Sequence, residues 1–402
     1  MPVLRRLFCN WEESDMVEWK KLEEIAKYRR GSFPQPYGKE EWYNGEGSMP
    51  FVQVADVEEN AMCLKETTKQ YISTLAMPMS VYVPQGSIVV TLQGSIGKVA
   101  ITQYESYVDR TLGIFTGFKI PINKKYFVYQ LQKIFSIKKE KARGGTIKTI
   151  TKEEFSKFEI PIPSKSEQER IVSILDTFTS SISNLKEQIK ERRKQYEYYR
   201  DQLLDLEGKD GVEMKILKDI FETRNGYTPS TKNDEFWTNG VIPWFKMEDI
   251  RENGRILSDS NLHITPKAIK GKGLFKANSI ILATSATIGE HALILVEHLS
   301  NQRFTNLYPK KEFESLVNMK FYYYYMFVID EWCKQHINQG GFASVDMDGL
   351  YKLAIPIPSK EEQLRIVSIL DQFEASIANL EAQLKEREKQ YEYYRNRLLT
   401  FV

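Results

Sequence analysis

Cysteine, histidine, long apolar runs and an excess of either charge are all scarce in this sequence. The three cysteines, Cys9, Cys63 and Cys333, are far apart, so they form neither a disulfide framework nor a metal-ligand cluster, which fits a reducing cytoplasm. No stretch approaches the roughly 18 apolar residues that read as a membrane helix, and the N-terminus lacks the apolar core of a signal peptide. The formal net charge of +2 means that charge alone does not indicate nucleic-acid binding. We expect a cytoplasmic protein.

Motifs for catalysis are missing as well. The sequence has no Pro-Pro dipeptide, which the [DNS]-P-P-[FYW] motif of adenine methyltransferases requires. The stretch closest to a phosphate-binding loop, residues 94–99, has the wrong spacing and no hydroxyl after its lysine. The four histidines form no H-x-x-x-H pair. We therefore expect a chain that is not an enzyme by itself, with no metal site and no cofactor of its own.

One long segment is present twice. Residues 160–207 and 355–402 align without a gap at an offset of 195, and 33 of the 48 positions are identical. A repeat of this length describes the whole molecule rather than a local motif. It predicts four parts: a first domain at residues 1–159, a first repeated segment at 160–207, a second domain at 208–354, and a second repeated segment at 355–402.

Each repeated segment is predicted to be one long helix. Apolar residues follow one another in steps of four and three through residues 171–206 and 366–401, a pattern typical of a coiled-coil seam. Each seam is interrupted once, by Arg192 and by Arg387, and a polar break of this kind can fix the register of two helices. A helix of about 40 residues is roughly 60 Å long, so each must pack along a partner. The other copy is the simplest partner.

The domains ahead of the two copies share a fainter framework. Anchor residues recur at offsets of 192 to 195: Gly31 with Gly226, Asp56 with Asp249, and Gly97 with Gly289. Around them lie a short opening helix, β-branched strands and a late aromatic helix. The predicted fold class is α+β: two pseudo-twofold-related α/β domains separated by two long helices that pack as an antiparallel coiled coil.

Two different domains on a twofold framework suit duplex DNA, which has a twofold backbone symmetry of its own. A shared framework with divergent loops also suits sequence reading, because the framework sets the geometry and the loops select the ligand. The alternative is a coiled-coil structural adaptor whose two domains bind proteins rather than DNA. The near-neutral charge favours that alternative.

Taken together, these features resemble a known family. Two variable domains, each followed by an IPIPS-x3-Q-x2-IV-x-ILD helix that ends in QYEYYR-x2-LL, are similar to the specificity (S) subunit of type I restriction-modification systems. The resemblance covers essentially the whole chain. It implies a non-catalytic subunit whose two target recognition domains each read one half of a bipartite, asymmetric DNA target, while the central and distal helices set the spacing between the halves.

The same resemblance implies partners. The helices would dock two modification (methyltransferase) subunits, which carry S-adenosylmethionine and methylate adenines. Restriction subunits would add translocation and cleavage driven by ATP with Mg. On this interpretation the cofactors belong to the partner subunits, no membrane is involved, and the complex works in the cytoplasm of a bacterium or archaeon.

Candidates for DNA contact are polar or basic residues on turns that flank strands, because arginine and glutamine suit base edges while lysine and hydroxyls suit phosphates. In the first domain they are Arg29, Arg30, Gln35, Tyr37, Gln93, Ser95 and Lys98. In the second domain they are Arg224, Tyr227, Thr228, Ser230, Lys246, Thr284, Ser285 and Arg303.

The repeated QYEYYR sequence supplies candidates for partner binding. Tyr196 and Tyr199 fall on the predicted seam, so we assign them to the helix contact. The candidates lie off the seam, and they are Glu197, Tyr198 and Arg200 in the first copy and Glu392, Tyr393 and Arg395 in the second. Exposed aromatic rings and arginine are enriched in the energetically important parts of protein interfaces.

Overall fold

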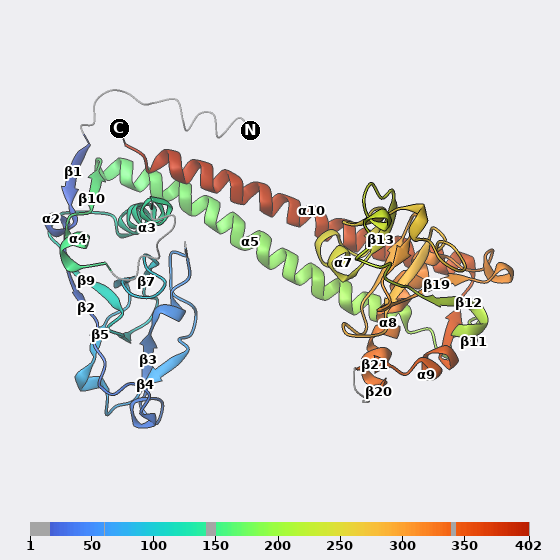
Figure 1. Cartoon of the computed structure of the whole chain (residues 1–402). Helices are drawn as coiled ribbons and strands as arrows, with labels where there is room; N and C mark the ends of the chain where they lie inside the picture. The colour runs from blue at the N-terminus through green and yellow to red at the C-terminus, as the bar shows by residue number, and fades with distance from the viewer. Residues whose placement is uncertain (1–16, 60, 142–149, 339–342, 402) are drawn as a thin grey trace. The chain divides into compact units, whose positions relative to one another are not determined.

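The computed structural model describes residues 17–59, 61–141, 150–338 and 343–401. The chain divides into two units: unit 1 holds residues 1–184 and 383–402, and unit 2 holds residues 185–382. The long helices α5 (Lys165–Leu204) and α10 (Lys360–Leu398) each contribute residues to both units. Each unit therefore combines a mixed domain with part of each long helix (Figure 1). Within the described ranges, no helix is long and apolar enough to cross a membrane.

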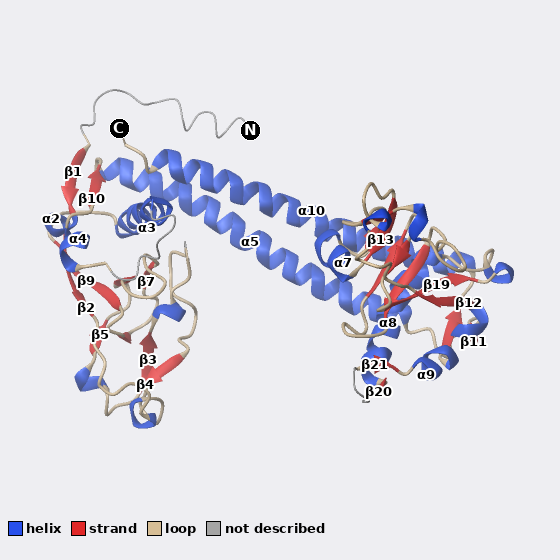
Figure 2. Cartoon of the chain, viewed as in Figure 1, coloured by secondary structure: helices blue, strands red, loops and turns tan. Residues whose placement is uncertain are grey.

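Unit 1 contains two four-stranded sheets (Figure 2). The first has the order β2 (Ala26–Arg30), β9 (Leu112–Phe118), β6 (Ile88–Thr91), β7 (Val99–Ile101), and the second has the order β4 (Gln70–Ile72), β3 (Met49–Val52), β8 (Ser106–Val108), β5 (Val81–Val83). The helices are α2 (Leu22–Ile25), α3 (Lys124–Lys141) and α4 (Lys152–Ser156), with 3-10 turns at Glu40–Trp42, Val54–Asp56 and Met77–Met79. Strands β1 (Glu18–Lys21) and β10 (Glu159–Ile162) pair antiparallel just ahead of α5.

Unit 2 repeats this plan. Its larger sheet has the order β12 (Phe221–Asn225), β19 (Phe304–Pro309), β16 (Ser279–Ala283), β17 (His291–Ile294), β14 (Ile256–Leu257), and its smaller one has the order β15 (His263–Ile264), β13 (Ile242–Phe245), β18 (Leu299–Ser300). The helices are α6 (Leu217–Ile220), α7 (Met247–Asn253), α8 (Met319–Gln335) and α9 (Met347–Lys352), with 3-10 turns at Asp234–Phe236, Pro266–Ala268 and Lys311–Phe313. Strand β11 (Glu213–Ile216) pairs antiparallel with β22 (Ala354–Ile357), and β20 (Ile337–Asn338) pairs with β21 (Ser344–Val345).

The main core of each unit lies between its first sheet and its aromatic helix. In unit 1, Val90 of β6 and Phe127 of α3 are fully buried in one cluster. In unit 2, Ile280 of β16 and Tyr322 of α8 are buried in the corresponding cluster. The late aromatic helices expected from the sequence are therefore core elements, which explains their run of large side chains.

The junction between the aromatic helix and the long helix is the same in both units. Lys125 forms an ion pair with Asp176 (2.6 Å), and Lys320 forms the equivalent pair with Asp371 (2.7 Å). The Asn123 N–H donates to the Gln168 side chain (2.9 Å), and the Asn318 N–H donates to the Gln363 side chain (2.8 Å). Both pairs of contacts repeat at an offset of 195. Residues of α3 and α8 that are 195 apart therefore occupy equivalent places in their units.

Within each unit the two long helices run antiparallel. In unit 1, Phe178 of α5 stacks on Tyr394 of α10 with ring centroids 5.4 Å apart. Ile171, about two turns before Phe178 in α5, packs in the same cluster as Leu398, which follows Tyr394 in α10. Earlier residues of α5 thus meet later residues of α10. The expected α+β class and the antiparallel packing of the long helices are confirmed.

Unit 2 contains the equivalent helix contact. Phe373 stacks on Tyr199 with ring centroids 5.5 Å apart. The interruptions of the seam lie beside these rings, since the Arg192 guanidinium is 5.9 Å from the Phe373 ring centre and the Arg387 guanidinium is 5.6 Å from that of Phe178. Each arginine thus stacks on an aromatic ring of the facing helix, a cation–π contact that pins the register.

Candidate nucleic-acid interface and partner surface

Three loops leave the same end of the first sheet in each unit. In unit 1, β2 ends opposite Gly113 and β6 ends opposite Leu112, at the start of β9. In unit 2, β12 ends opposite Thr305 and β16 ends opposite Phe304, at the start of β19. The loops that meet there are residues 31–37, 92–98 and 109–111 in unit 1, and residues 226–230, 284–290 and 301–303 in unit 2. We name this region of each unit its loop end.

Main-chain hydrogen bonds hold the loop ends together. The bonds recur in both units: the Leu92 N–H donates to the Thr111 carbonyl (2.9 Å) and the Thr284 N–H to the Arg303 carbonyl (3.0 Å), while the Gly31 N–H donates to the Leu112 carbonyl (3.0 Å) and the Gly226 N–H to the Phe304 carbonyl (3.0 Å). These backbone bonds are shared by the two units although most of the loop side chains differ.

One pair of repeated glycines in these loops, Gly31 and Gly226, is required by close packing. A Cβ atom on Gly31 would lie 2.3 Å from the Val108 carbonyl oxygen, and one on Gly226 would lie 2.3 Å from the Asn301 carbonyl oxygen. Asp249, the repeat of Asp56, has a different structural role. Its buried carboxylate accepts hydrogen bonds from the Lys246 N–H (2.8 Å) and the Asn261 N–H (2.6 Å). These anchors shape the framework and leave the neighbouring side chains free to differ.

In unit 1, an exposed aromatic and basic cluster lies at the loop end. The Tyr37 hydroxyl donates a hydrogen bond to the Asp109 carboxylate, and the exposed Arg110 guanidinium lies 4.7 Å from the Tyr37 ring centre. Burial and the Asp109 carboxylate raise the pKa of Tyr37, so its hydroxyl stays protonated and a donor. Gln35 and Ser95 are exposed there as well.

The remaining candidates of unit 1 vary in exposure. Gln93 and Lys98 are half-buried on the β6–β7 turn. Arg29 and Arg30 are exposed at the end of β2, where Arg30 Nη2 donates to the Ile150 carbonyl (3.5 Å). The unit thus brings Arg30, Gln35 and Tyr37 to the sheet end from which the β6–β7 turn also leaves.

In unit 2, the equivalent loop end carries different polar groups. The Thr228 hydroxyl donates to the Gln302 side-chain carbonyl (2.5 Å). Ser230 and Arg303 are exposed beside this pair in sequence, and Ser285 is half-buried. A hydroxyl, an amide and a guanidinium therefore replace the tyrosine, carboxylate and guanidinium of unit 1.

Three candidates of unit 2, Thr284, Arg224 and Tyr227, make contacts within the unit. Thr284 is buried, its hydroxyl lies 3.1 Å from that of Thr305, and its carbonyl accepts the Val345 N–H of β21 (2.9 Å). Arg224 Nη2 donates to the Gly273 carbonyl (2.8 Å) and its guanidinium stacks 4.1 Å from the centre of the Phe275 ring.

Tyr227 has a structural role, and Lys246 makes a weaker contact. The Tyr227 hydroxyl donates to the Ala268 carbonyl (3.0 Å) and accepts the Lys270 N–H (2.8 Å), which ties down the loop that follows. Lys246 is half-buried at the start of α7, with its ammonium 4.0 Å from Glu248.

Two exposed residues at the loop ends escaped the sequence analysis. Arg110 and Gln302 lie at equivalent positions directly ahead of β9 and β19, 192 residues apart. The offset of 192 between Gly97 and Gly289 was the signal that pairs them. Extending that offset from the strands into the preceding loops identifies both residues.

The partner-binding candidates form a repeated surface on the long helices. Tyr198 and Tyr393 are 61% and 58% exposed, and each packs edge-on against the next tyrosine, Tyr199 or Tyr394, at an interplanar angle of 76°. Tyr199, which is 49% exposed, and the half-buried Tyr394 stack in turn on the seam phenylalanines. Glu197 and Glu392 are also exposed.

The two arginines of this surface differ. Arg200 pairs with Asp201 (2.8 Å) and its guanidinium lies 4.6 Å from the Phe327 ring centre. Arg395 lies 5.7 Å from the Tyr391 ring centre, and both arginines are half-buried. The exposed tyrosines are therefore alike in the two copies, while their surroundings are not.

Comparison with known proteins agrees with this architecture. The chain is 51% identical over 205 residues to the type I restriction enzyme EcoprrI specificity subunit of Escherichia coli, covering 48% of this chain and 51% of that protein. It is 37% identical over 268 residues to the EcoR124I/EcoR124II specificity subunit of Escherichia coli, covering 61% and 64%. The matched regions thus span about half to two thirds of these relatives.

Solved structures share the fold. The crystal structure of the type I restriction-modification system S subunit from M. genitalium superposes with a TM-score of 0.55 at 15% identity, covering 98% of both chains. The family model described as the type I restriction modification DNA specificity domain matches residues 15–192 and again residues 209–389. The chain therefore belongs to the family of type I restriction-modification DNA specificity domains, and it carries two of them.

Proposed function

We propose that this chain is the non-catalytic DNA-specificity subunit of a type I restriction-modification complex. Each domain reads one half of a bipartite, asymmetric target with its loop end, and the long helices set the spacing of the half-sites. The observation that carries the proposal is the loop end itself: the backbone bonds are the same in both units, while the exposed side chains differ. Different side chains on one backbone frame suit two different base sequences.

The exposed residues at the loop ends fit direct reading of bases. Arginine binds guanine in a bidentate manner and glutamine binds adenine, each pair being worth about 1–3 kcal/mol of discrimination. Arg110 is backed by Tyr37, and the amide of Gln302 is oriented by Thr228. Both side chains are therefore partly preorganised, which reduces the entropy lost on binding.

The repeated tyrosine surface would dock two modification subunits. A surface that occurs twice in one chain fits two copies of the same partner, and exposed tyrosines are common interface anchors. S-adenosylmethionine, ATP and Mg would belong to modification and restriction subunits, and the complex would work in the cytoplasm.

The test uses the chain assembled with its modification subunits. Deleting the gene from its host should abolish methylation of one bipartite adenine motif, and exchange of residues 212–352 for another second domain should change one half of that motif. Arg110→Ala and Gln302→Ala should each relax one half-site only. Arg251→Ala, on the exposed face of α7, is the control. Binding to DNA without sequence preference or salt dependence would instead favour the protein-binding adaptor.

A further inference from the structure

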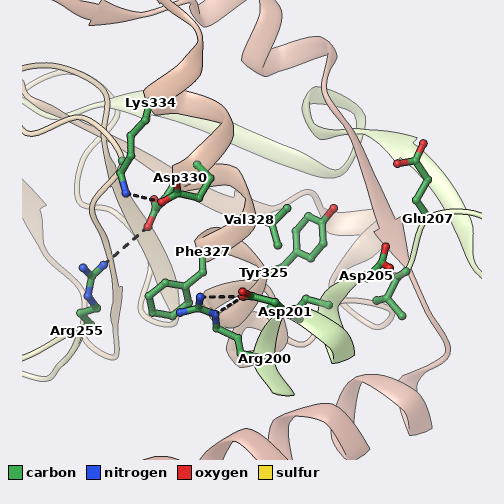
Figure 3. Close-up of a pocket in the computed structure, with 14 residues that line it drawn as sticks. Arg200, Asp201, Asp205, Glu207, Arg255, Tyr325, Phe327, Val328, Asp330 and Lys334 are labelled. Carbon is green, nitrogen blue, oxygen red and sulfur yellow. Dashed lines mark hydrogen bonds and ion pairs between the residues drawn. The ribbon is translucent and has the colours of Figure 1, made fainter. Parts of the chain in front are cut away.

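A pocket of about 640 Å³ opens in unit 2 where α5 ends (Figure 3). One wall comes from the last turns of α5 and the residues that follow, up to Glu207, and another comes from α8. Tyr325, Phe327 and Val328 supply apolar surface, and Val328 is 41% exposed. The site therefore offers an apolar wall within reach of charged groups.

The charges around this pocket do not balance. Its lining contains three basic and five acidic side chains, a formal charge of −2. Arg200 is paired with Asp201 (2.8 Å), and Asp205 and Glu207 have no ion pair within the part of the chain that the structure describes. Both lie just past the end of α5, where the helix dipole adds further negative potential. Burial, together with the Glu207 and Asp205 carboxylates, raises the pKa of Tyr325, which lines the pocket, to about 12.

One of the five acidic side chains is buried. Asp330 is 3% exposed; its Oδ2 lies 2.7 Å from His291 Nδ1 and 3.9 Å from Arg255 Nη1. Burial lowers the pKa of His291, so the imidazole contributes a hydrogen bond rather than a charge. Among the described residues, Asp330 Oδ1 has no hydrogen-bond partner.

Unit 1 shows what fills the same place there. Lys133 of α3 lies 195 residues before Val328, and its ammonium donates to the Thr400 hydroxyl (2.5 Å) at the end of α10. Beside it, Gln130 Nε2 donates to the Leu399 carbonyl (3.2 Å). In unit 1 the chain thus supplies its own cation at the end of the long helix.

At the equivalent positions, unit 2 has fewer basic and more acidic side chains than unit 1, which favours binding of a cation from another molecule. Valine stands at the position of Lys133, and acids stand where unit 1 has neutral residues, namely Asp201 for Asn396 and Asp205 for Thr400. Burial, and secondarily Arg395, lowers the pKa of Lys133 to about 8, whereas a cation in unit 2 would meet carboxylates instead. The pocket of unit 2 therefore has no lysine at the position of Lys133, and the Lys334 in its lining is paired with Glu331 (2.6 Å).

We propose that this pocket receives a lysine or arginine side chain from a modification subunit that docks on the tyrosine surface of unit 2, an inference that rests on the proposed function. The aliphatic part of that side chain would lie along Tyr325 and Val328, and its cationic head would meet Asp205 and Glu207. The pocket adjoins the docking surface through Arg200, which belongs to both. Since Lys133 fills the equivalent place in unit 1, the two docked subunits are held unequally.

The test moves the arrangement of unit 1 into unit 2. The double variant Val328→Lys with Asp205→Thr places a lysine at the position equivalent to Lys133 and should weaken binding of one of two purified modification subunits at least tenfold, leaving the other unchanged. Val241→Lys, which makes the same exchange at a valine that is 72% exposed and outside the pocket lining, should bind like the wild type. Circular dichroism melting confirms that each variant is folded.

A second measurement identifies the occupant. A benzophenone amino acid at position 328 should cross-link, in the assembled complex, to a modification-subunit peptide that contains lysine or arginine. Wild-type affinity of the double variant, or cross-links only to DNA or to peptides without a basic residue, would overturn the inference. If the wild-type complex assembles and selects DNA sequences in either case, the proposed function stands; if the wild type binds no modification subunit, both fail.

Discussion

Alanine at the two seam phenylalanines should destabilise the protein unequally, although the positions are equivalent in the repeat. Phe178 is 4% exposed, stacked on Tyr394 and close to the Arg387 guanidinium. Phe373 makes the same stacking contact with Tyr199 but is only half-buried. The internal repeat therefore offers a matched pair of variants whose main difference is burial.

The expected magnitudes follow from that burial. Truncating a fully buried phenylalanine costs about 3–5 kcal/mol, including the cavity left behind. We expect Phe178→Ala to fall in that range, because the ring is almost entirely enclosed. Phe373→Ala should cost about half as much, roughly 1.5–2.5 kcal/mol, since part of its ring already faces water.

The assay should resolve each unit separately, because the chain divides into two compact units and a single unfolding free energy need not describe both. Hydrogen exchange followed by mass spectrometry on peptides covering residues 171–185 and 366–380 reports local opening free energies. Phe178→Ala should deprotect the first peptide more than Phe373→Ala deprotects the second. Equal losses, or a larger loss for Phe373→Ala, would refute the argument that burial decides the energy of the seam.

Three further changes test other features. Burial raises the pKa of the Glu374 carboxyl, although hydrogen bonds from Tyr324 and Tyr196 oppose this shift. The native state therefore holds the Glu374 proton more tightly than the unfolded chain does, and the wild type loses this stabilisation as pH rises. The melting temperature of Glu374→Gln relative to the wild type should thus increase between about pH 4 and pH 8, and a decrease would contradict the assigned direction of the pKa shift. Gly31→Ala should destabilise by about 1–3 kcal/mol in urea unfolding, whereas Gly117→Ala, with open space around its Cβ position, should be nearly neutral. Inserting four residues at both 185–189 and 380–384 should lengthen each long helix by about 6 Å, which is close to two base-pair steps of about 3.4 Å. The two methylated half-sites should then lie about two base pairs further apart. An unaltered gap between them would show that the helices do not set the spacing.

The helices were predictable because their stabilising contacts recur at a fixed period. The seam needs only the 4-3 spacing of residues such as Ile171 and Phe178, and both are buried as expected. The anchor glycines were predictable as a pair, although their reason, a close approach to the carbonyls of Val108 and Asn301, depends on strands far away in sequence.

The loop residues were harder because a turn position does not determine exposure. Thr284 looked like its neighbour Ser285, but the threonine is buried and its carbonyl accepts the N–H of Val345 in the distant β21. Arg224 looked like a free basic residue, yet it stacks on Phe275. Gln302 shares the offset of 192 with Arg110, but its place at the loop end follows only from the pairing of β19 with β12.

The main-chain bonds of the loop ends have a consequence for how this molecule can acquire new ligands. Since amide and carbonyl groups hold these turns, exchanging Gln35, Ser230 or Gln302 removes no bond on which the backbone depends. Such exchanges should alter recognition at little expense in folding. New recognition specificities can therefore arise by exchange of side chains on a constant backbone, and the loop end of one unit can change without altering that of the other.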